Sequence, residues 1–186
     1  MSQYGNKVLY NMCKDEPLHQ NIDIIASKLW IIGRSYAAAI ERKAGVNFKI
    51  EDAARIIQAS DIDKHLVQMQ KVDRLDNSNV NLSLEVHHIF ANLLRDATGI
   101  VKRSLASKYL HFHAPNAFFI YDSIANTKIR KALKREQSRF TISKSYDDEY
   151  ESFVRRCLYY RNNILEMKLK KLATPRRVDM ELLGYK

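Results

Sequence analysis

The chain has 186 residues, of which 46% are apolar and 28% charged, and its net charge is +10. This length suits one domain that buries a hydrophobic core of its own. Two cysteines without Cys-x-x-Cys spacing, no apolar run near the ~20 residues of a membrane span, and a polar N-terminus exclude disulfide-stapled secreted, membrane and fibrous proteins, and predict a cytoplasmic protein without membrane contact.

The strongest helical pattern covers residues 20–43. Apolar residues recur there at three- and four-residue steps from Ile22 to Ile40, which is typical of a helix with one buried face. Gly45 stands where such a helix is expected to end. Trp30 lies beside the apolar stripe and is expected to anchor the core.

Seven further helices are predicted from the same periodicity and from their start and stop signals. Gly99 and Pro115 mark helix ends, Asp122 is placed to cap a helix, and Pro175 suits a first turn. The apolar run 118–121 is too brief to form a sheet. We therefore expect an all-α single domain, residues 1–186, of about eight helices, with a helical hairpin near 84–112. The other predicted helices span residues 50–58, 61–74, 84–97, 104–112, 123–136, 147–170 and 175–183.

Several catalytic motifs are absent from the sequence. It contains no glycine-rich phosphate loop, no Gly-x-Ser-x-Gly elbow and no zinc-ligand spacing, and His111 and His113 are too close in sequence to share one helical face. No metal or cofactor is therefore expected. Arg161-Asn162 resembles the RNxxxH signature of HEPN-type ribonucleases, but Glu166 stands where that motif has its histidine. Because the general acid/base is missing, this reading is the third alternative.

The segment 84–133 carries the most information about function. It combines a helix, a turn with one glycine, a second helix that contains Lys108, and Asp122 at the start of a further helix. This order resembles the helix-hairpin-helix DNA glycosylases, in particular the 8-oxoguanine glycosylase-like fold. In that family a lysine opens the helix after the hairpin and attacks the sugar C1′, while an aspartate stabilises the developing positive charge. The resemblance implies these catalytic roles for Lys108 and Asp122.

Each member of this pair also has a purely structural interpretation. Lys108 is then a solvated lysine of an amphipathic helix, and Asp122 is only an N-cap. The positions of the two side chains distinguish the catalytic from the structural interpretation, because the members of a catalytic pair must face one site.

Positive charge is concentrated in the second half of the chain. Residues 1–101 carry 12 Lys+Arg and 12 Asp+Glu, whereas residues 102–186 carry 19 and 9. Such asymmetry favours a polyanionic partner, and we expect nucleic acid, first of all DNA. The alternatives are a basic surface without a partner, and a non-catalytic nucleic-acid-binding or protein-interaction module. The candidate nucleic-acid contacts are Lys102, Arg103, Lys128, Lys131, Lys134, Arg135, Arg155 and Arg156.

Overall fold

The computed structural model describes residues 3–140 and 142–185, and these form the helices α1 to α10 and no strand, which confirms the all-α prediction. Helices α8 and α9 are continuous through a π-helical turn, η2, and a short 3₁₀ turn, η1, follows α7. No helix in this part of the chain is long and apolar enough to cross a bilayer. The elements are α1 (Gln3–Asp15), α2 (Ile22–Ser35), α3 (Ile50–Gln58), α4 (Ile62–Met69), α5 (Val80–Thr98), α6 (Arg103–His113), α7 (Ser123–Ala132), η1 (Lys134–Arg139), α8 (Asp148–Tyr160), η2 (Arg161–Leu165), α9 (Glu166–Leu169) and α10 (Pro175–Leu183).

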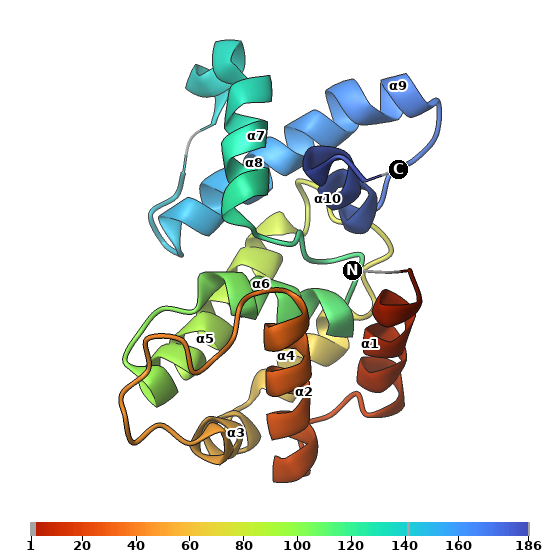
Figure 1. Cartoon of the computed structure of the whole chain (residues 1–186). Helices are drawn as coiled ribbons and strands as arrows, with labels where there is room; N and C mark the ends of the chain where they lie inside the picture. The colour runs from red at the N-terminus through yellow and green to blue at the C-terminus, as the bar shows by residue number, and fades with distance from the viewer. Residues whose placement is uncertain (1–2, 141, 186) are drawn as a thin grey trace.

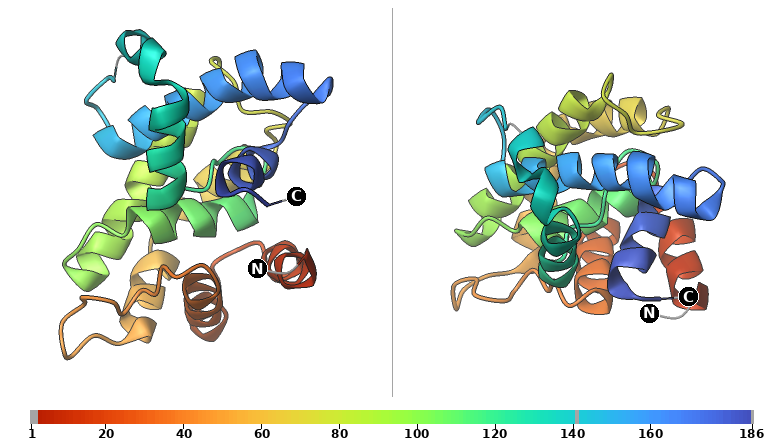
Figure 2. Two further views of the ribbon diagram at one scale, coloured as in Figure 1. Left: turned by 45° about the horizontal axis from the view of Figure 1, so that its top comes forward. Right: turned by 90° about the horizontal axis from the view of Figure 1, so that it is seen from above.

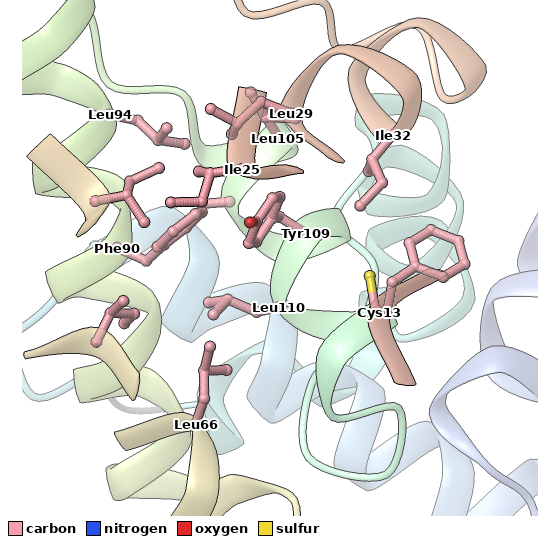
Figure 3. Packing of buried hydrophobic residues seen from close by; sticks show 14 of the residues in the cluster. Cys13, Ile25, Leu29, Ile32, Leu66, Phe90, Leu94, Leu105, Tyr109 and Leu110 are labelled. Carbon is pink, nitrogen blue, oxygen red and sulfur yellow. The ribbon is translucent and has the colours of Figure 1, made fainter. Parts of the chain in front are cut away.

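Helix α6 lies in the middle of the molecule. Helices α1 to α4 cover one side of it, and α7 to α10 gather on the other (Figures 1 and 2). Each side has its own hydrophobic cluster. In the first cluster, the Tyr109 ring of α6 lies among apolar side chains of α2 and α5, including Ile25 and Phe90 (Figure 3). The Phe90 and Tyr109 rings stack with their centroids 4.8 Å apart.

The segment 118–121, which is neither helix nor strand, connects the two clusters. Phe118 belongs to the first cluster and Phe119 to the second, and both are fully buried. The side chains of these two neighbouring residues enter different clusters, so one short segment reaches both. The Tyr150 hydroxyl donates a 2.9 Å hydrogen bond to the Phe119 carbonyl and so fixes α8 to this segment. The expectation that this apolar run forms no sheet is confirmed.

Local signals in the sequence set several of the helix ends. Gly99 adopts a φ of +72° and ends α5, which is the left-handed conformation that glycine tolerates best. Asp122 caps α7 by accepting a 2.8 Å hydrogen bond from the Ile124 amide. Asp147 caps α8, and Pro175 occupies the first turn of α10. These predicted boundaries are confirmed.

The predicted helix over residues 20–43 is wrong at its C-terminal end. Helix α2 stops at Ser35, and the chain then folds back, with the Ala38 amide donating a 2.7 Å hydrogen bond to the Gly33 carbonyl. A Cβ at Gly33 would lie 3.2 Å from the Ala38 carbonyl oxygen, so this close return depends on glycine. Ile40 is buried as predicted, but from this loop and not from a helix.

Trp30 was also predicted wrongly. Its side chain is 54% exposed, because the buried face of α2 consists of Ile25, Leu29 and Ile32 and the indole lies outside that face. Four smaller differences concern the other helices. Helix α4 ends at Met69, α5 begins at Val80 and not at residue 84, α7 ends at Ala132, and α1 is not among the predicted helices.

The return of the chain onto Gly33 gives a stability prediction. Gly33→Val should lower the free energy of unfolding by about 1–3 kcal/mol, because the added side chain meets backbone atoms that cannot move away freely. Gly45→Val is the matched control, since a Cβ at Gly45 meets no atom within 4 Å, and its effect should stay within about 0.5 kcal/mol. Urea unfolding of both variants measures the difference. Equal effects would contradict this role of Gly33.

Candidate functional site

The candidate site is built around α6, a helix that is buried on all sides from Leu105 to His113. Apolar residues fill only part of this surface, so its polar side chains must find partners inside the protein. Ser107 accepts a hydrogen bond from the Tyr121 amide at 2.9 Å, and its hydroxyl donates to the Ser104 carbonyl at 3.0 Å. The segment after α6 is thereby held against the helix, which brings Asp122 back towards it.

Lys108 and Asp122 lie together in this arrangement. The Lys108 ammonium is 3.9 Å from the Asp122 carboxylate, and it donates hydrogen bonds to the Ser104 hydroxyl at 2.7 Å and the Tyr36 carbonyl at 3.2 Å. Lys108 is only 2% exposed, so the interpretation as a solvated lysine is wrong. Asp122 caps α7 and faces the lysine at the same time, so capping alone does not account for its position.

The surroundings of Lys108 lower the pKa of its amine. Burial lowers the pKa of the amine, while the nearby carboxylates of Asp122 and Asp179 oppose this shift. The Lys108 nitrogen also lies 6.0 Å from the centre of the Tyr36 ring, and the Arg176 guanidinium lies 5.9 Å from the same ring. The amine therefore lies among positively and negatively charged side chains, and its burial leaves it little contact with water.

Asp179 completes this cluster from α10. It is 4% exposed, and one carboxylate oxygen pairs with Arg176 at 2.5 Å. The other oxygen has no hydrogen-bond partner among the described residues. Burial raises the pKa of this carboxyl to about 6, against the opposing influence of Arg176 and Lys108. Asp179 was not a candidate from the sequence, because its place near Lys108 depends on helix packing. Ser104 was missed although it lies four residues before Lys108 on the same helix, a spacing that brings side chains together.

A cavity of about 280 Å³ lies at the turn between α5 and α6, and Ser104 is its contact with this cluster. Ser104 lines it, so the Lys108 amine lies one hydrogen bond behind the cavity wall. Tyr121 and four cationic residues also line it, and α6 begins there without a side-chain cap, which adds the positive end of its dipole. The four cationic residues are Arg42, Lys43, Lys102 and Arg103.

Two of these cations were candidates from the sequence. Lys102 opens α6, donates a hydrogen bond to the Arg42 carbonyl, and has a pKa lowered by partial burial. Arg103 pairs with Asp147 at 2.6 Å and Glu149 at 2.9 Å, so it ties the hairpin to the start of α8. Lys102 therefore has more freedom to meet an anion than Arg103 has.

The predicted basic face after Asp122 is divided between two elements. Lys128 and Lys131 lie on α7, whereas Lys134 and Arg135 lie on η1, because α7 ends at Ala132. All four basic side chains are exposed, and none of them pairs with a carboxylate among the described residues. This group is referred to below as the α7 basic surface.

The two candidate arginines of α8 are engaged within the fold. Arg155 pairs with Glu151 at 2.6 Å. Arg156 is 8% exposed, bonds to Ser152, and lies 5.3 Å from the centre of the Phe140 ring. These two arginines are therefore less accessible to a partner than the residues of the α7 basic surface.

Arg161, the first residue of the ribonuclease-like pair, is fully buried. It donates a 2.5 Å hydrogen bond to the Leu75 carbonyl and lies 5.7 Å from the Phe119 ring centre. Glu166, at the position of the missing histidine, pairs with Arg74 at 2.8 Å. These contacts connect the α8–α9 helix to the loop before α5, which is a structural role.

The histidines of α6 are buried and hydrogen-bonded. His111 donates from Nδ1 to the Phe118 carbonyl at 2.8 Å and accepts at Nε2 from the Tyr10 hydroxyl at 2.7 Å. His113 donates to the Tyr109 carbonyl at 2.9 Å. Burial lowers the pKa of His111 to about 4 and that of His113 well below its usual value, so both rings are neutral. No group of three potential metal ligands occurs among the residues described.

Comparison with known proteins leaves the site to be interpreted from its own geometry. No protein-family model matches the chain, and searches of curated proteins and of solved structures give no match.

The buried carboxylate of Asp179 predicts a pH effect on stability. Its folded-state pKa of about 6 exceeds the ordinary value of 3.8, so its contribution to stability is present at low pH and is lost as the pH rises through about 6. Asp179→Asn keeps an acceptor for Arg176 but does not ionise. Its free energy of unfolding should gain up to about 3 kcal/mol over wild type between about pH 4 and pH 7. Urea unfolding at several pH values tests this, and a pH-independent difference would contradict it.

Proposed function

We propose that this chain is a DNA-binding base-excision protein of the glycosylase/lyase type, in which Lys108 is the nucleophile. The supporting observation is the approach of Lys108 to Asp122 within 3.9 Å, behind a cavity lined by cationic residues. A lysine and an aspartate from separate elements, with the amine buried and its pKa lowered, form a constellation suited to amine chemistry at a sugar carbon.

The chemistry begins with the neutral amine of Lys108. Its lone pair forms a bond to C1′, the bond between C1′ and the base nitrogen breaks, and the bonding electrons leave with the base. The proton that the attacking nitrogen loses is transferred to the departing base. Opening of the sugar then gives an imine between Lys108 and C1′, which water hydrolyses. Burial lowers the pKa of the amine, so less free energy is needed to deprotonate it.

Asp122 supports this reaction electrostatically. Positive charge develops on the sugar as the base departs, and a fixed carboxylate nearby stabilises it. The carboxylate is already oriented, because it accepts the Ile124 amide as the cap of α7. It needs no rearrangement to face the reacting carbon, which is the condition for effective electrostatic catalysis.

Substrate reaches the pair through the cavity at the α5–α6 turn. Removal of a base requires the nucleotide to leave the duplex stack, and the cavity of about 280 Å³ would receive it. The exchange of the Ser104–Lys108 hydrogen bond for contact with the sugar exposes the amine. Lys102, Lys43 and the start of α6 are placed to hold the flanking phosphates.

A second function is favoured by the depth of Lys108 and by the α7 basic surface. With 2% of Lys108 exposed, a chain that never opens the Ser104 contact would bind nucleic acid without catalysis. The exposed cations of α7 and η1 serve such a binding module equally well.

Borohydride trapping tests the enzyme. Wild-type protein, incubated with duplexes that carry oxidised or alkylated bases, should form a covalent adduct on reduction of the imine. Lys108→Met, which keeps the length of the side chain but has no amine, should form none. Asp122→Asn keeps the cap, since asparagine caps helices as well as aspartate does, but removes the charge. It should slow adduct formation by about 10²- to 10³-fold.

The control for this experiment is Lys102→Ala, the second lysine at the cavity. It should keep the adduct with weaker substrate binding. Loss of the adduct in Lys102→Ala but not in Lys108→Met would make Lys102 the nucleophile and refute the role of Lys108. Binding without an adduct across a broad panel of damaged bases would leave the non-catalytic module. Thermal unfolding of each variant shows whether it is folded.

Salt dependence tests the binding surface. Replacing both Lys131 and Lys134 by alanine should weaken binding to all DNA sequences alike and flatten the plot of log affinity against log salt by roughly one to two units. The cause is that fewer counterions are released when fewer cations contact phosphates. The matched control, Lys49→Ala with Lys71→Ala, removes two exposed lysines from the charge-neutral half and should leave the slope unchanged. An unchanged slope in the first variant would exclude this surface.

A further inference from the structure

A second cavity, of about 400 Å³, lies on the outer side of the α8–η2 helix. It shares no lining residue with the cavity in front of Lys108. Two aromatic rings and three side-chain amides line most of it, which is an unusual set for a surface hollow. The lining residues are Asn77, Phe140, Arg155, Leu158, Tyr159, Asn162 and Asn163.

The aromatic part of this cavity is held in place. The rings of Phe140 and Tyr159 meet edge to face, with centroids 5.7 Å apart and planes at 85°. The guanidinium of Arg156 lies 5.3 Å from the centre of the Phe140 ring and supports it. Both rings are only partly buried, so they offer apolar surface to a flat ligand in the cavity.

The two asparagines of η2 are polarised by their contacts. The Asn162 side-chain oxygen accepts hydrogen bonds from Arg161 at 2.9 Å and from Arg74 at 3.1 Å. The Asn163 side-chain nitrogen donates to the Tyr159 carbonyl at 2.9 Å. In the part of the chain that the structure describes, the Asn162 amide N–H groups and the Asn163 oxygen have no partner. The cavity therefore offers one fixed donor beside one fixed acceptor.

The π-helical turn brings these two amides into the same cavity. Arg161 points inward at the start of the turn and bonds to the Leu75 carbonyl, so the residues after it face outward. Adjacent residues of a regular α-helix point about 100° apart, whereas the wider turn lets Asn162 and Asn163 line one hollow. Single π turns inside helices often mark functional sites.

We propose that this cavity binds the amino-bearing edge of a nucleobase, with adenine as the preferred base. Adenine presents an amino group next to a ring nitrogen, which are a donor and an acceptor in the order that Asn163 and Asn162 require. The purine stacks on Tyr159, which lines the cavity. Cytosine has the same donor and acceptor with a smaller stacking surface. The proposal goes beyond the base-excision activity, because it uses none of the residues near Lys108.

The ligand chemistry fits both a free nucleotide and a base of a single strand, and the experiment separates them. Wild-type protein is titrated calorimetrically with AMP and with IMP, and then with short oligodeoxyadenylate and oligodeoxyinosinate. IMP has the donor and acceptor reversed on an otherwise matched ring. High salt screens the exposed basic residues, so that binding reports on the cavity. AMP, or the adenylate strand, should bind about 5- to 150-fold more tightly than its inosine counterpart.

Two variants locate the site. Asn163→Leu removes the acceptor and should abolish the preference for adenine, while Tyr159→Ala should weaken all bases by about 5- to 150-fold through lost stacking. Asn47→Leu, an exposed asparagine of the first half, is the control and should bind as wild type.

Each outcome decides the proposal. If AMP binds more tightly than IMP, the ligand is a free nucleotide. If only the adenylate strand binds more tightly than its inosine counterpart, the ligand is a single strand. Equal binding of adenine and hypoxanthine, no binding of either, or a preference that survives in Asn163→Leu overturns the proposal. Failure of the base-excision function is a separate result, because Lys108→Met leaves this cavity intact and should keep the preference for adenine.

Discussion

A helix with buried polar side chains lies at the centre of this protein, and the other elements are arranged around the partners it needs. An unpaired polar group inside a protein costs about 1–3 kcal/mol, so each such side chain on α6 requires a contact at a defined place. Tyr109 donates to His19 at 2.8 Å, and His19 in turn pairs with Asp63 at 2.5 Å. His113 lies 3.3 Å from the buried amine of Lys28. Helices α1, α2 and α4 are therefore positioned by polar contacts as well as by apolar packing.

Charge is distributed differently in the structure from its distribution along the sequence. Much of the positive charge of the second half is used internally, as the buried Arg161 and the paired Arg103 and Arg155 show. The cations of this half that stay accessible include Lys102 at the α5–α6 turn and the four residues of the α7 basic surface. The net charge of the sequence therefore overstates the positive charge that is free to meet a partner, because it includes cations held in internal ion pairs.

The parts of the fold that were predictable from sequence are those that local chemistry determines. Gly99 ends a helix and Asp122 begins one because of backbone conformation and capping, and neither needs a distant partner. The end of α2 was not predictable, because it depends on the chain returning to within 3.2 Å of where a Gly33 Cβ would stand. The pairing of Lys108 with Asp122 was expected only from the order of elements. The contribution of Asp179 had no local signal, since it arrives from α10 through tertiary packing.

The alternation of Phe118 and Phe119 between the two hydrophobic clusters has a consequence for how the protein loses its structure. Neither cluster can be dissolved without pulling on the segment that the other one holds, so the two sides of the molecule are expected to melt in one cooperative transition. Slow amide exchange should accordingly extend across both sides instead of stopping at the middle of the chain. Although the sequence divides into a neutral half and a basic half, both halves are expected to unfold together.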